Sequence, residues 1–144
     1  MMLVALVLTL VMALVAGLHA YWARGGLWPA QSEQELTSMV VGDPRLTGMP
    51  PRALTGLVAG VLAGIALWPL ILAPFLSMVL PWGVLVAATF LLAAVFLVRG
   101  MASYFSGVKR LNAVEPFRRL NRRYYGPLCI LVGLGFLMLA FNGV

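Results

Sequence analysis

The chain opens on an apolar stretch, MLVALVLTLVMALVAGLHAYW, which occupies residues 2–22. An α-helix of about 20 residues is long enough to cross the ~30 Å hydrocarbon core of a bilayer. The stretch contains no Asp, Glu, Lys or Arg. No basic residue precedes it, which argues against a cleaved signal peptide. The stretch therefore predicts a retained transmembrane helix.

Further apolar runs of similar length follow, and none has a charged side chain in its middle. A transmembrane β-barrel would instead show alternating segments of about ten residues. Backbone groups without partners cannot face lipid, so helices are the remaining choice. The sequence predicts one all-α membrane domain over residues 1–144, a four-helix transmembrane bundle. Its spans are expected at residues 2–22, 53–73, 81–98 and 125–142.

The composition excludes a soluble domain. Hydrophobic residues make up 62% of the chain and charged residues 10%, against roughly 25% charged in soluble domains. The net charge of +6 could suggest nucleic acid. However, the basic residues lie in short segments beside apolar spans, where such clusters meet anionic lipid headgroups. We therefore expect membrane lipids as partners and no nucleic acid.

The basic residues also predict the orientation. All ten Lys and Arg residues lie in the segments 23–52 and 99–124, and none lies in the tails or in the turn between the second and third spans. The positive-inside rule makes both basic segments cytoplasmic. Both termini are then expected on the outer side of the membrane.

Each basic segment predicts a short interfacial helix. In the first, Ser32 and Glu35 form a capping box for a helix over residues 31–41. In the second, Asn112 and Glu115 have the same spacing, and the helix of the third span is expected to continue to Leu111. Pro69, by contrast, is expected to kink or end the second span, because proline removes a backbone donor.

The helix expected after Glu115 is amphipathic. Phe117, Leu120 and Tyr124 share one face, and arginines cover the rest, as in helices that lie in the bilayer interface. One interpretation is an orientation anchor on lipid headgroups, and the other is a binding site for an anionic ligand. The predicted headgroup-binding residues are Arg118, Arg119, Arg122 and Arg123.

Glycines recur every four residues in the second span, at Gly56, Gly60 and Gly64. They line one helix face and let another helix approach closely. We predict a packing face there, with a partner in the same chain or in another copy. A homo-oligomer or a larger membrane complex therefore remains open.

No signature of nucleotide binding or of metalloprotease chemistry is present in the sequence. The chain has one His and one Cys, so we expect no protein-only metal site, no cofactor and no intrachain disulfide at Cys129. Glu115 is expected to pair with Arg118 or Arg119. His19 is either an interfacial residue bonded to a neighbour or a ligand contact.

Several short segments of the sequence resemble the signature segments of a protein family. They read H-x-Y-W-A-x-G-G over residues 19–26, V-R-G over 98–100, F-R-R-L-N over 117–121 and Y-x-P-L-C over 125–129. In order and spacing the chain resembles an uncharacterised bacterial family of small four-span membrane proteins, a domain of unknown function. The resemblance implies a multi-pass protein of the bacterial inner membrane and no particular activity. Asn121 departs from the family pattern, which favours Asp there.

The matching residues direct attention to one level of the bundle. By the predicted topology they lie on the cytoplasmic side, where convergent polar groups over an apolar pocket would form a binding site. The competing interpretation is a polar network that locks the helix ends. The predicted ligand-binding residues are His19, Tyr21, Trp22, Arg99, Glu115, Asn121 and Tyr125.

Three functions remain open at this point. The first, which we favour, is a non-catalytic bundle that binds a lipid or a small anionic amphiphile, or serves as an accessory subunit. The second is a small homo-oligomeric transporter or channel, which the lack of charges within the spans disfavours. The third is an intramembrane enzyme at headgroup level, which the lack of a nucleophile–base pair disfavours.

Overall fold

The computed structural model describes residues 1–105 and 114–142, and every regular element within them is helical. Four helical stretches, Met2–Ala23, Arg52–Leu76, Trp82–Met101 and Phe117–Phe141, are long and apolar enough to cross a membrane. The predicted all-α bundle of four transmembrane helices is confirmed. The elements are α1 (Met2–Ala23), α2 (Glu33–Val40), α3 (Arg52–Leu67), η1 (Trp68–Leu72), α4 (Ala73–Leu76), α5 (Trp82–Met101), α6 (Phe117–Leu120), η3 (Asn121–Tyr125) and α7 (Gly126–Asn142).

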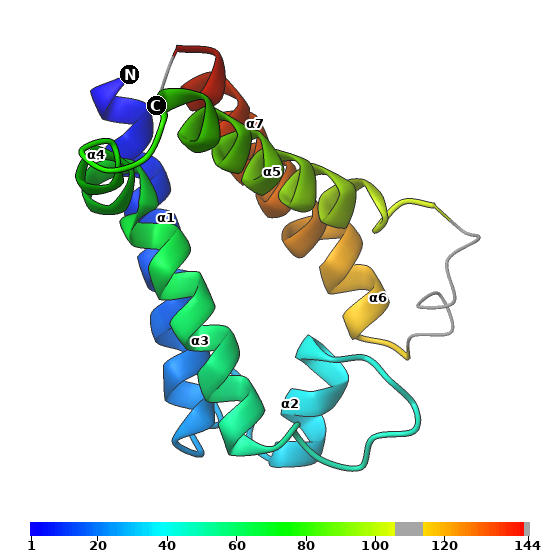
Figure 1. Ribbon diagram of the computed structural model, residues 1–144. Coiled ribbons are helices and arrows are strands. Elements are labelled where there is room, and N and C mark those ends of the chain that lie inside the picture. Colours follow the sequence, from blue (N-terminus) through cyan, green and yellow to red (C-terminus); the bar gives the residue numbers. More distant parts are fainter. Residues whose placement is uncertain (106–113, 143–144) are drawn as a thin grey trace.

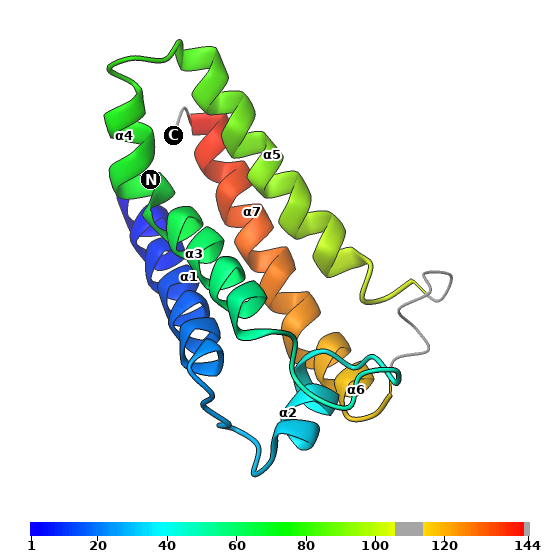
Figure 2. The ribbon, with the colours of Figure 1, turned by 60° about the horizontal axis from the view of Figure 1, so that its bottom comes forward.

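The four long helices form two pairs. Helix α1 packs along α3, and α5 packs along α7. The pairs meet near the chain termini and diverge toward α2 and α6 (Figures 1 and 2). Their shared core includes Met12 of α1, Ala93 of α5 and the fully buried Phe136 of α7. The first turn of α1 and the last turn of α7 lie at the same end of the bundle (Figure 1), as four crossings require.

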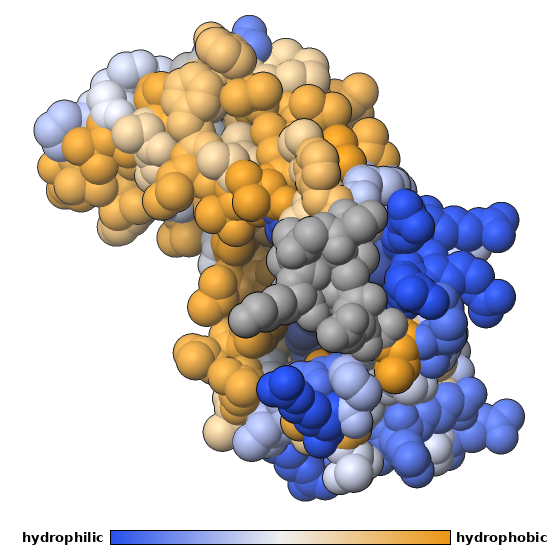
Figure 3. Space-filling view, turned by 90° about the vertical axis from the view of Figure 1, so that its right-hand side faces the viewer, coloured by the Kyte–Doolittle hydropathy of each residue, from blue (hydrophilic) through white to orange (hydrophobic). Residues whose placement is uncertain are grey.

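The opposite end carries the charges. We call it the arginine-rich end, and it comprises residues 23–52, 99–105 and 114–124. A space-filling view shows hydrophobic residues over the helices and hydrophilic ones gathered at this end (Figure 3). The exposed apolar surface of the helices suits lipid as their solvent, because a water-soluble fold would bury it.

The second span passes through Pro69 instead of ending there. Helix α3 continues into the π-helical turn η1 and then into α4, which ends at Leu76. A π turn beside a proline accommodates the missing backbone donor without a break. Trp68 in this turn donates its indole N–H to the hydroxyl of Thr89 on α5, at 3.0 Å. This hydrogen bond joins the two helix pairs away from the arginine-rich end.

The fourth span also begins earlier than expected. Helix α6, the π turn η3 and helix α7 follow one another directly from Phe117 to Asn142. The amphipathic segment is therefore the first part of the fourth transmembrane helix and not a separate interfacial helix. Pro127 lies just after η3, so a π turn again accompanies a proline. The expected cap at Asn112 and the helix extension to Leu111 lie outside the described residues.

Helix α2 confirms Ser32 as its N-cap, whereas Glu35 reaches back to the residue before the cap and not to Ser32 itself. The backbone N–H of Glu35 donates to the Ser32 hydroxyl at 3.2 Å, and the Glu35 carboxylate accepts from the Gln31 N–H at 2.9 Å. The helix is shorter than the predicted 31–41 and covers Glu33–Val40. Its buried Leu36 and Thr37 show which face packs inward.

The glycines at which two helices come closest are not those of the predicted repeat, Gly56, Gly60 and Gly64. A Cβ at Gly60 or Gly64 would meet nothing within 4 Å, and one at Gly56 would meet only Ala23, at 3.9 Å. By contrast, a Cβ at Gly100 or Gly133 would press into the facing helix at under 3 Å. In the described chain, glycines therefore bring α5 and α7 together and leave the α3 glycine face open.

Candidate functional site

Arg99 organises one polar group at the arginine-rich end. It lies in the last turn of α5, where its two Nη atoms donate to the Ser103 hydroxyl and to the Asn121 side-chain oxygen, each at 3.1 Å. Ser103 is buried, and a Cβ on Gly126 would lie 2.9 Å from it. The glycine therefore lets the fourth span approach this network. Within the described residues, neutral oxygens and no carboxylate accept hydrogen bonds from the Arg99 guanidinium.

Tyr125 forms a second group that ties the fourth span to α2. Its hydroxyl donates to the backbone carbonyl of Met39 at 3.2 Å, and its ring lies 6.0 Å from the ring of Phe117. Phe117 is buried against Gly42, which has φ +69° and no room for a side chain. The backbone N–H of Val114 donates to the Gly42 carbonyl at 3.1 Å. These contacts hold α2 against the first turns of the fourth span.

His19 belongs to a third group, at the end of α1. Its Nδ1 donates to the Val15 carbonyl at 2.8 Å, and its ring lies 5.1 Å from that of Trp22. The Trp22 indole N–H donates to the Trp28 carbonyl at 2.8 Å. The ring of Tyr21 is exposed and lies against Gly26. No hydrogen bond joins this group to Arg99, Asn121 or Tyr125 within residues 1–105 and 114–142.

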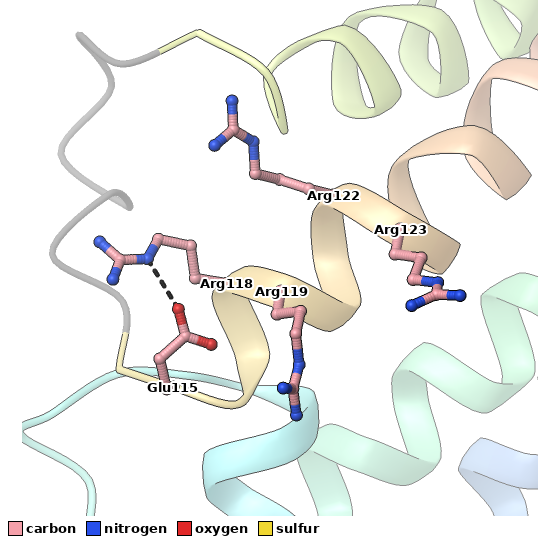
Figure 4. A pocket seen from close by; sticks show the side chains of 5 residues that line it. All are labelled: Glu115, Arg118, Arg119, Arg122 and Arg123. Atoms are coloured by element: carbon pink, nitrogen blue, oxygen red, sulfur yellow. Dashed lines mark hydrogen bonds and ion pairs between the residues drawn. The ribbon is translucent and has the colours of Figure 1, made fainter.

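The arginine cluster comprises Arg118, Arg119, Arg122 and Arg123, on α6 and η3. With Glu115 it bounds a cavity of about 600 Å³. Glu115 pairs with Arg118 at 3.0 Å, as one of the two expected ion pairs. The four side chains fan out around the helix instead of converging on one point (Figure 4). The Arg123 guanidinium also lies 5.6 Å from the centre of the Tyr124 ring.

Acidic side chains neutralise little of the positive charge at the arginine-rich end. Glu33 accepts from the Met49 N–H at 3.0 Å, and Asp43 accepts from the Arg45 N–H at 2.9 Å. Together with the capping residue Glu35, three of the four carboxylates in the sequence therefore serve backbone donors. Glu115 makes the one ion pair that the described residues contain. The arginine-rich end thus presents an excess of positive charge.

The structure separates the predicted ligand-binding residues into groups instead of gathering them around one pocket. Sequence reasoning named Arg99 and Asn121 but missed Ser103, whose position four residues after Arg99 was the available signal. It also missed the backbone carbonyl of Met39, which leaves no trace in side-chain identity. In the described part of the chain, no three His, Cys, Asp or Glu side chains are grouped to hold a metal ion.

Asn121→Asp should stabilise the protein. The aspartate keeps the acceptor for Arg99 and adds charge, and charge-assisted hydrogen bonds are roughly twice as strong as neutral ones. We expect a gain of about 1 kcal/mol, and a loss of about 1–3 kcal/mol for Asn121→Leu, which leaves Arg99 without that acceptor. Thermal unfolding in detergent measures both, with the exposed Gln34→Glu as a control for charge. Equal stability of the two Asn121 variants would contradict the role assigned to this contact.

Comparison with known proteins places the chain in a family. Residues 12–136 match the family model described as a protein of unknown function, DUF3995. No curated protein and no solved structure matches the chain. The expected resemblance to an uncharacterised family is confirmed in this form. The chain belongs to the DUF3995 family of proteins of unknown function.

Proposed function

We propose that the protein is a non-catalytic membrane bundle that binds anionic lipid headgroups through the arginine cluster at its arginine-rich end. We further propose that this end faces the cytoplasm of a bacterial inner membrane. The observation that carries the proposal is the arginine cluster, whose four guanidinium groups have one carboxylate, Glu115, beside them. A guanidinium presents a planar set of donors that matches phosphate oxygens.

The arrangement of the cluster favours a lipid surface over one compact anion. The side chains of Arg119, Arg122 and Arg123 point in different directions around the helix (Figure 4). A single phosphate could not reach them all, whereas several headgroups in a leaflet could. Each cation near an anionic surface contributes on the order of 1 kcal/mol. The cluster also lies in the first turns of a helix that is long and apolar enough to cross a membrane, and we propose that these turns lie at the headgroup level.

Transport and catalysis have less support. A path for ions or protons is usually marked by ionisable residues within the spans, and the middles of these spans carry none. His19, the best single candidate for proton chemistry, is bonded to a backbone carbonyl of its own helix. An accessory role in a larger complex is compatible with headgroup binding.

Hydrogen exchange tests the proposal. The protein is placed in nanodiscs of phosphatidylcholine alone or of phosphatidylcholine with phosphatidylglycerol. We expect backbone amides of residues 117–125 to exchange several-fold more slowly with phosphatidylglycerol present, because bound headgroups hold the basic turns in place. Exchange is followed by mass spectrometry of peptides from this segment.

A triple variant and a control are compared. The triple variant combines Arg119→Gln, Arg122→Gln and Arg123→Gln. The control is the single change Arg45→Gln. The triple variant should lose the lipid dependence of exchange, and Arg45→Gln should keep it, because Arg45 lies outside the cluster. Equal exchange of the wild type in both nanodiscs would refute headgroup binding by the cluster.

A further inference from the structure

A second feature lies on the other helix pair, where α1 and α3 enclose a groove of about 650 Å³. Its lining consists of alanine and glycine, apart from Leu67 and Arg24. Ala16 and Ala59 are buried at the contact between the helices and form its floor. A Cβ at Gly17 or Gly60 would meet nothing within 4 Å, so the groove has room for another group.

The groove opens away from the rest of the bundle. On α1, Leu8 and Met12 belong to the core shared with α7. Ala13 lies about 100° further round the helix than Met12 and lines the groove. The occupant therefore approaches from the lipid side of the α1–α3 pair, not from between the two pairs.

Each of the two helices carries an arginine at the arginine-rich end of the groove: Arg24 lines the groove, and Arg52 begins α3. On α1, Ala13, Gly17 and Ala20 share one face, and Arg24 follows four residues later on the same face. The Arg24 guanidinium folds back along the groove, with Nη1 3.5 Å from the Ala20 carbonyl.

Helix α3 repeats this arrangement in the opposite direction. Arg52, its first residue, lies one helical turn before the groove residue Gly56 and on the same helix face, just beyond the groove lining. Its Nη2 would lie 3.0 Å from a Cβ on Gly25, the residue after Arg24. The two arginines are thus neighbours at one end of an otherwise apolar groove, and neither forms an ion pair within the described residues.

The dimensions fit one leaflet. From Ala13 to Arg24 the helix rises roughly 17 Å at 1.5 Å per residue. Half of the ~30 Å hydrocarbon core is about 15 Å. An acyl chain that lies in the groove would therefore place its headgroup beside Arg24 and Arg52.

Charge also decides between a lipid and a second copy of the chain. Small residues on a helix face can mediate helix–helix contact in membranes. However, copies inserted in the same orientation would bring Arg24 and Arg52 of one copy against the same residues of the other. Like charges at such distance repel, and the described part of the chain has no carboxylate there to offset them. An anionic lipid adds the missing negative charge.

We propose that the α1–α3 groove binds one acyl chain of an anionic phospholipid, and that Arg24 and Arg52 bind its phosphate. This site is separate from the arginine cluster and does not depend on the function proposed for that cluster. The groove site takes a single lipid molecule. The arginine cluster, by contrast, contacts several headgroups of the leaflet.

Native mass spectrometry tests the site. The protein is purified in mild detergent and mixed with phosphatidylglycerol or phosphatidylcholine. We expect the wild type to retain one phosphatidylglycerol molecule in preference to phosphatidylcholine. The double variant Arg24→Gln with Arg52→Gln should retain it about tenfold less. Gly60→Leu should reduce retention similarly, because Gly60 lines the groove and a Cβ there meets nothing within 4 Å.

Two controls make the result decisive. Gly64→Leu adds the same side chain on α3 at a position where a Cβ also meets nothing within 4 Å and which does not line the groove, so it should retain the lipid. Arg45→Gln removes one charge elsewhere and should retain it too. Equal retention by Gly60→Leu and the wild type would overturn the proposal. So would a dimer that Gly60→Leu dissociates without any loss of lipid. In every groove variant the exchange of residues 117–125 still responds to phosphatidylglycerol if the cluster binds headgroups, so the two proposals fail independently.

Discussion

Gly100→Ala will lower the stability of the protein far more than an alanine at any glycine of the α3 repeat. A Cβ at Gly100 would lie 2.6 Å from Cγ1 of Ile130, 2.8 Å from the Gly126 carbonyl oxygen and 2.9 Å from the Ile130 nitrogen. Two of these atoms are backbone, so the clash cannot be relieved by a rotamer change. Helices α5 and α7 must separate, and overpacking of this kind costs about 1–3 kcal/mol.

Gly133→Ala should behave in the same way from the other side of the contact. Its Cβ would lie 2.7 Å from Cγ of Leu97 and 2.9 Å from the Leu97 nitrogen. Gly60→Ala and Gly64→Ala are the matched controls, because a Cβ there meets open space. Alanine is favoured over glycine within a helix by up to about 1 kcal/mol, so these controls should be neutral or stabilising.

Thermal unfolding in detergent, followed by tryptophan fluorescence, ranks the four variants. The expected order places Gly100→Ala and Gly133→Ala well below the wild type, and Gly60→Ala and Gly64→Ala at or above it. The reverse order would show that the α3 glycines form the tight helix contact, as their spacing suggested.

The sequence predicts the fold class because length and apolar composition alone require four helices in lipid. It does not predict which faces pack. Within a span nearly every residue is apolar, so periodicity does not separate a protein-facing side from a lipid-facing side. The repeat of Gly56, Gly60 and Gly64 is therefore visible in the sequence, whereas the tight positions Gly100 and Gly133 are not.

Sequence patterns among neighbouring residues predict the structure better than they predict contacts between distant segments. Ser32 and Glu35 predicted their own helix start, because a capping box involves only neighbouring residues. At Pro69 the sequence leaves a kink and a helix end open, and the structure shows a helix that continues through a π turn, which absorbs the missing donor. The hydrogen bond from Tyr125 to the carbonyl of Met39 depends on how two distant segments meet. The two helix pairs diverge at the arginine-rich end, and this is why His19 and Arg99 do not share one hydrogen-bonded group.

The second prediction concerns the side of the membrane that the arginine-rich end faces. The proposed headgroup binding requires the arginine-rich end to face the cytoplasm, where anionic lipids give the leaflet surface a negative potential. The positive-inside rule predicts this orientation from the ten basic residues of the two segments. Both ends offer exposed positions for a reporter, Gln34 on α2 and Ser77 after α4.

Cysteine labelling in intact bacterial cells tests most directly whether the arginine-rich end faces the cytoplasm. Cys129→Ser removes the one native thiol, and Gln34→Cys or Ser77→Cys is added to that background. We expect a membrane-impermeant maleimide to label Cys at position 77 in intact cells, and position 34 only after the inner membrane is permeabilised. Labelling of position 34 in intact cells would place the arginine-rich end outside and contradict the proposed function.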